Sequence, residues 1–182
     1  MALSRLRRWS AHVAGLLRRR LLADVLIDQR VRAVPADAAE VWRVATAVGG
    51  RKGYPLDWLW RVRGAVDRAL AGPGLDRSGP SADEVSVRDR LDFWEVTELD
   101  RGRHLRMRGL LKIPGDAELA VTVREGEGVT VFTQTARFWP AGLAGHIYWW
   151  ALYPVHWLIF SSMAGRVARL AGTKQRGRPA RR

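Results

Sequence analysis

Hydrophobic and polar residues alternate with a period of two along five runs of this 182-residue chain. The first run covers residues 27–34, and the others cover 85–99, 103–113, 117–125 and 129–140. Successive side chains of a strand point to opposite faces, so each run predicts a β-strand. Short connections with glycine at 100–102, 114–115 and 126–128 predict hairpins between the later strands. These strands therefore form an antiparallel meander.

The first run assigns two sets of residues to the two faces of its strand. One face carries Ile27, Gln29, Val31 and Ala33, and the other carries Asp28, Arg30, Arg32 and Val34. Pro35 ends the strand, and two short helices are predicted after it, over 36–48 and 54–72, from apolar residues at helical spacing. A long helix follows Pro140. This order predicts an α+β domain in which a curved antiparallel sheet wraps around the C-terminal helix.

The stretch from Pro140 to Gly165 has no formal charge and allows two interpretations. Its length and the basic residues after it are typical of a membrane span. Pro154 in its middle, His146 and His156 within it, and aromatic residues throughout its length are not. Because the sheet needs a cover and no other late segment can supply one, we favour a helix that packs on the sheet.

Charge divides the chain into a neutral middle and two basic ends. The net charge is +13, and residues 1–20 and 166–182 hold the whole excess without a single acidic residue. We therefore predict a basic N-terminal arm or helix over 1–24, one domain over 25–170, and a basic disordered tail over 171–182. The expected location is the cytoplasm. Weak contact of the ends with an anionic membrane surface stays open, whereas specific nucleic-acid binding is not expected.

None of the motifs that would indicate common catalytic chemistry is present. The chain has no cysteine, and its four histidines lack the spacing of metal ligands. Neither G-x-S-x-G nor a P-loop occurs, and the glycines within 72–79 do not form G-x-G-x-x-G. We therefore predict no metal site, no cofactor and no identifiable catalytic residue.

Nine tryptophans favour a large core or a ligand cavity between the long helix and the sheet. The residues predicted to line such a cavity are Trp58, Trp60, Trp94, Tyr148, Trp150 and Trp157. Gln134, Arg106 and Arg108 stand out on the strands, although the period-two pattern places both arginines on a solvated outer face. Asp57 and Asp92 have aromatic neighbours and are candidate acid–base groups, with surface or ion-pair roles as the simpler interpretation.

Three segments carry a resemblance to a known family: "YPLDWLWRVRGAVDRALAGPGL", "LDFWEVTELDRGRHLRMRGLLKIPG" and "VTVFTQTARFWPAGLAGHIYWWALYPVHWLIFSSMAGRVAR". Over residues 26–170 the chain resembles an uncharacterised bacterial domain family. That family occurs alone or C-terminal to NAD(P)-binding domains of the short-chain dehydrogenase type. It is similar in turn to the START and birch-pollen-allergen superfamily, which includes polyketide cyclases. The resemblance implies a helix-grip fold and supplies no catalytic residues.

Three hypotheses for the function follow from the pattern and the resemblance together. The first is a module that binds a lipid-like or polycyclic apolar molecule in an internal pocket. The second is an enzyme of the cyclase, dehydratase or isomerase type that uses a pocket carboxylate. The third is an accessory partner of a separate NAD(P)-dependent oxidoreductase. The absence of catalytic motifs favours the binding module.

Overall fold

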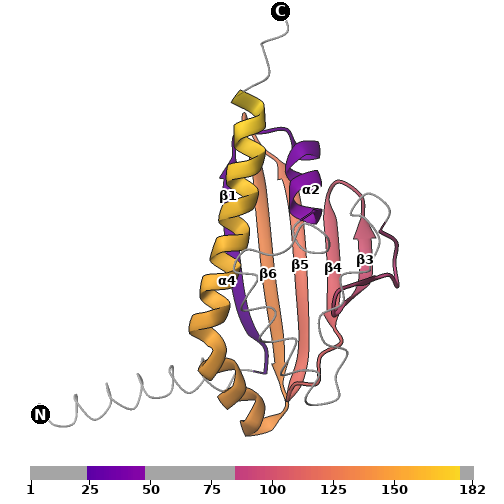
Figure 1. The fold of residues 1–182 in the computed structure, drawn as a ribbon, viewed down its shortest axis with the longest axis vertical. Coiled ribbons are helices and arrows are strands. Elements are labelled where there is room, and N and C mark those ends of the chain that lie inside the picture. The colour runs from indigo at the N-terminus through magenta and orange to yellow at the C-terminus, as the bar shows by residue number, and fades with distance from the viewer. Residues whose placement is uncertain (1–23, 48–84, 177–182) are drawn as a thin grey trace, which may run out of the picture.

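The protein is described by a computed structural model that covers residues 24–47 and 85–176. The strands and helices, in chain order, are β1 (Leu26–Val34), α2 (Ala38–Thr46), β2 (Arg90–Leu91), β3 (Trp94–Asp100), β4 (His104–Gly109), β5 (Gly115–Glu125), β6 (Thr130–Pro140) and α4 (Gly142–Arg176). The strands form one antiparallel sheet in the order β1-β6-β5-β4-β3-β2. In Figure 1, α4 runs along β1 and β6, and α2 lies over the end of β5, on the same face.

The expected architecture is confirmed. The later strands pair in sequence order, as hairpins require. The first strand, β1, pairs with the last one, β6, and so forms one edge of the sheet. The long helix packs on the sheet face that the strands leave apolar. Together these features make an α+β domain of the helix-grip type. The second predicted short helix, at 54–72, lies outside the described residues.

Residues 85–99 do not form the single strand that their alternation predicts. The structure has the two-residue β2, a turn, and then β3. Arg88 and Asp92 adopt left-handed backbone conformations, with φ angles of 79° and 58°. Aspartate tolerates this conformation better than most residues, so Asp92 can reverse the chain between the two strands. The strand predicted over 103–113 also ends early, at Gly109.

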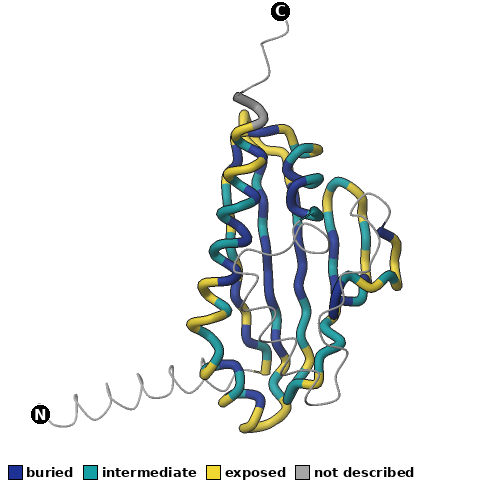
Figure 2. Tube along the Cα trace, in the orientation of Figure 1, coloured by how far each residue is buried: buried dark blue, intermediate teal, exposed yellow. Residues whose placement is uncertain are grey.

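The two faces of the sheet differ in polarity as the alternation predicts. On β4, Leu105 and Met107 are buried beneath the helices. On the opposite face, Arg106 lies 3.1 Å from Glu98 and Arg108 lies 2.9 Å from Glu95, measured between side-chain nitrogen and oxygen atoms. Figure 2 shows the resulting buried stretches along β5 and β6. The outer-face placement of both arginines is therefore confirmed.

α4 continues to Arg176, six residues into the segment assigned to a disordered tail. Ala164, Val167 and Ala171 are almost completely buried, at intervals of three and four residues. This spacing keeps one stripe of the helix against the core, and no proline occurs between Ala164 and Arg176. Among the described residues, no helix combines the length and the hydropathy that crossing a membrane requires.

Candidate functional site

Two apolar clusters lie between the helices and the sheet. The smaller one consists of Leu26, Phe138 and Trp149, with Tyr148, Trp150 and Tyr153 packed around it. The larger one includes α2, the middle strands and the second half of α4. The aromatic first half of α4 therefore packs in the smaller cluster. Methionine, alanine and valine residues of its second half pack in the larger one.

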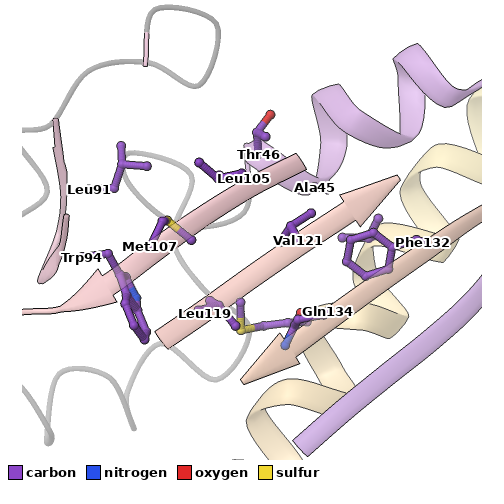
Figure 3. A pocket seen from close by; sticks show the side chains of 12 residues that line it. Ala45, Thr46, Leu91, Trp94, Leu105, Met107, Leu119, Val121, Phe132 and Gln134 are labelled. Atoms are coloured by element: carbon purple, nitrogen blue, oxygen red, sulfur yellow. The ribbon is translucent and has the colours of Figure 1, made fainter. Parts of the chain in front are cut away.

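A small cavity lies within the larger cluster. Figure 3 shows side chains that surround it from α2 and from the strands. The lining residues are Ala45, Thr46, Leu91, Trp94, Leu105, Met107, Leu119, Val121, Phe132, Gln134, Met163 and Val167. The volume of the cavity is about 40 Å³, which is room for roughly three water molecules.

Gln134 is the exceptional residue of this lining. It is only 3% exposed, and its Nε2 atom has no hydrogen-bond partner among the described residues. The Thr46 hydroxyl, in contrast, donates to the carbonyl of Trp42 at 2.9 Å. A buried amide without a partner costs free energy, so such groups generally mark a bound water or a ligand. Gln134 thus places an unsatisfied polar group against an otherwise apolar cavity.

An ion pair adjoins Gln134 on the same face of the sheet. Arg30 is the cross-strand partner of Gln134 on β1, and its Nη2 donates to Asp28 Oδ2 at 2.8 Å. The Asp28 side chain is 1% exposed and that of Arg30 is 18% exposed. Among the described residues, Asp28 Oδ1 and Arg30 Nε have no hydrogen-bond partner. Burial raises the pKa of the Asp28 carboxyl above its ordinary value, and the Arg30 guanidinium partly opposes this rise.

The predicted site residues separate into three groups. Trp94 lines the cavity, as does Gln134. Trp58 and Trp60 lie outside the described residues. Tyr148, Trp150 and Trp157 are not among the lining residues: the first two pack around the smaller cluster, and Trp157 is 50% exposed with its ring 5.9 Å from the Arg30 guanidinium carbon. These three lie outside the lining of this cavity because the part of α4 that reaches it begins only at Met163, and their role in ligand binding stays a prediction.

Of the two candidate acid–base residues, only Asp92 lies within the described part of the chain, and it does not line the cavity. Asp92 is buried in the turn between β2 and β3, and Asp57 lies outside the described residues. The part of the lining that residues 24–47 and 85–176 supply contains no carboxylate and no imidazole. No group of side chains with the composition of a metal site occurs within residues 24–47 and 85–176.

The buried carboxylate of the helix-covered face is Asp28, which the sequence analysis did not select. Its signal was present in the alternation of 27–34, where Asp28, Arg30 and Arg32 share one face. A charged row normally indicates the solvent side of a strand. In this protein that face lies beneath α4, and the Asp28–Arg30 pairing reduces the cost of burying the two charges.

The six-stranded antiparallel sheet and the long C-terminal helix that covers it define a helix-grip fold. Residues 21–163 match the family model described as "Protein of unknown function (DUF2867)", and the chain belongs to this family. None of the curated proteins matches it in sequence.

Solved structures provide an independent comparison of the fold. The di-domain ARO/CYC StfQ from the steffimycin biosynthetic pathway is 8% identical, with a TM-score of 0.51 over 85% of this chain and 52% of that chain. The Aha1 dimer from Colwellia psychrerythraea is 11% identical, with a TM-score of 0.49 over 81% of this chain and 96% of that chain. Identities this low concern the fold and not the activity.

Proposed function

We propose that this domain binds a small, largely apolar molecule in the cavity between α2, α4 and the sheet. The observation that carries the proposal is the cavity itself, which the described residues line with mostly apolar side chains and with Gln134, whose Nε2 atom has no hydrogen-bond partner among them. An apolar pocket with one well-placed polar group is the usual composition of a small-molecule site. The similar structure StfQ is named as a di-domain ARO/CYC of a biosynthetic pathway, which supports a role with a small molecule.

The size of the cavity sets a condition on this function. About 40 Å³ is too small for a lipid-like or polycyclic molecule. Met107 and Met163 both line the cavity, and methionine side chains change shape more easily than branched ones. Binding therefore requires these two side chains to move aside, and one-ring molecules are the appropriate first probes.

The enzyme hypothesis is the second candidate and is less well supported. A cyclase, dehydratase or isomerase would need an acid or base within reach of its substrate. The lining supplied by the described residues has none, and Asp28 lies one strand beyond Gln134. Docking on a separate oxidoreductase and contact of the basic ends with a membrane stay predictions.

Filling the cavity is expected to abolish binding. Ethylbenzene should raise the melting temperature of the full chain, because a ligand that binds only the folded state stabilises it by about 2.7 kcal/mol at a concentration of 100 times its Kd. Val121 lines the cavity, so Val121→Phe should remove this increase. Thermal unfolding followed by circular dichroism measures both effects.

The matched control makes the same substitution on the opposite face of the sheet. Val31 is 50% exposed on β1, and Val31→Phe should keep the response to ethylbenzene. If Val121→Phe does not fold because of overpacking, Val121→Ile adds only one methylene and should weaken the response. An equal increase of the melting temperature in wild type and in both Val121 variants would refute the proposed function.

A further inference from the structure

Polarity changes across the helix-covered face of the sheet along one row of cross-strand partners. The register aligns Leu105 on β4, Val121 on β5, Gln134 on β6 and Arg30 on β1. Directly paired residues of antiparallel strands share a face. The row therefore passes from hydrocarbon through a neutral amide to a guanidinium, and the cavity covers its first three members.

At the polar end of this row, some buried donor and acceptor atoms have no hydrogen-bond partner among the described residues. Gln134 Nε2 and Arg30 Nε are donors without acceptors among the described residues, and Asp28 Oδ1 is an acceptor without a donor there. Gln134 is the one of the three residues that lines the cavity. Figure 3 shows Gln134 among the apolar side chains that line the same cavity, so one ligand can contact both the amide and the apolar wall.

We propose that the ligand carries a neutral acceptor oxygen, a carbonyl or a hydroxyl, on an apolar skeleton, and that this oxygen accepts a hydrogen bond from the Gln134 amide. This inference rests on the proposed function, because it names the class of ligand for the same cavity. A purely hydrocarbon ligand would leave the amide buried without a partner, which is unfavourable. A site that must hydrogen-bond its ligand discriminates strongly against analogues that lack the polar group.

An anionic ligand fits this end of the cavity less well than a neutral one. Arg30 is the nearest cation in the row, and the Asp28 carboxylate already neutralises it through a 2.8 Å ion pair. A ligand carboxylate would add an uncompensated negative charge to a buried site, which costs more than burying a neutral oxygen. The expected ligand is therefore a ketone or an alcohol, and not a fatty acid.

Three one-ring probes of nearly equal shape test this preference: ethylbenzene, acetophenone and benzoate. Ethylbenzene has a methylene group where acetophenone has its carbonyl group. Benzoate has a carboxylate in place of the methyl ketone. We expect calorimetry on the full chain to show acetophenone binding about tenfold more tightly than ethylbenzene, the gain of one buried hydrogen bond. Benzoate should bind more weakly than acetophenone.

Gln134→Leu is the decisive variant. Leucine has a similar size and removes an unsatisfied buried amide, so the variant is expected to fold. It should bind acetophenone and ethylbenzene within about threefold of each other, because the hydrogen bond is gone. Gln29→Leu is the matched control: Gln29 lies on the other face of β1, where it donates to Thr135 at 3.0 Å. This control should keep the tenfold preference.

The amide itself can be observed by ¹⁵N NMR. The sequence contains three glutamines, at 29, 134 and 175, and no asparagine, so only three side-chain carboxamide groups contribute signals. Acetophenone should shift the Gln134 signals, which the Gln134→Leu spectrum identifies by their loss, and ethylbenzene should shift them much less.

The outcomes separate this inference from the proposed function. If both uncharged probes bind equally well and Gln134→Leu changes neither affinity, the ligand class is wrong while the cavity remains a binding site. Tighter binding of benzoate than of acetophenone would also overturn the ligand class. If none of the three probes binds, both the inference and the proposed function fail.

Discussion

Replacing Trp149 by alanine is expected to lower the free energy of unfolding by about 3–5 kcal/mol. Trp149 is 4% exposed, and its ring stacks on Phe138 with centroids 5.5 Å apart and planes inclined by 10°. The ring also contacts Tyr153 and His156. Removing it would leave a large cavity between the first half of α4 and the sheet. Urea unfolding monitored by circular dichroism measures the loss.

Trp150→Ala is the matched control for this prediction. Trp150 is adjacent in sequence but only half-buried, and its ring packs on Tyr153 at 5.5 Å. Its removal should cost less, about 1–2 kcal/mol, since part of its surface already faces solvent. Equal losses for the two variants would contradict the orientation of α4 on the sheet.

Gly145→Ala is expected to lower the free energy of unfolding by about 1–3 kcal/mol, the usual cost of overpacking, or by more. Gly145 lies in the first turn of α4, against the ends of β5 and β6. A Cβ atom there would collide with the carbonyl oxygen of Pro114 and would lie 2.7 Å from Pro140 Cα. Because both neighbours are backbone atoms, the helix would have to move away from the sheet.

Replacing Gly165 by alanine should raise the free energy of unfolding, in contrast to the same substitution at Gly145. Gly165 lies in the interior of α4, and a Cβ atom there would have no neighbour within 4 Å. Gly165→Ala should therefore stabilise the protein by about 0.5–1 kcal/mol through helix propensity alone. In thermal and urea unfolding, Gly145→Ala should be less stable than wild type and Gly165→Ala more stable. Stabilisation by Gly145→Ala would contradict the close approach of α4 to Pro114 and Pro140.

The fold could be predicted from the sequence because alternation, glycine turns and the uncharged helix all indicate the same architecture. The meander from β3 to β6 follows directly from period two and short connections. The break at Asp92 could not be predicted, since alternation describes side-chain polarity and does not report a left-handed backbone angle.

The site was harder to predict than the fold. Alternation divides β1 into two faces, but it does not say which face lies beneath a helix, so Asp28 and Arg30 were missed. On α4, aromatic residues point in almost every direction over 148–157, so the predicted site residues of this helix fall in its first half. The half that lines the cavity contributes Met163 and Val167, which give no distinctive sequence signal.

The central claim is that a ligand occupies the cavity of the larger cluster, and methionine methyl NMR tests it most directly. The chain has three methionines, at positions 1, 107 and 163, and two of them line the cavity. With ¹³C-methyl-labelled full-length protein and acetophenone, the signals of Met107 and Met163 should shift and show nuclear Overhauser effects to the ring of the probe, while Met1 stays unchanged. Contacts of the probe with Tyr148 or Trp150 and with neither Met107 nor Met163 would contradict the account.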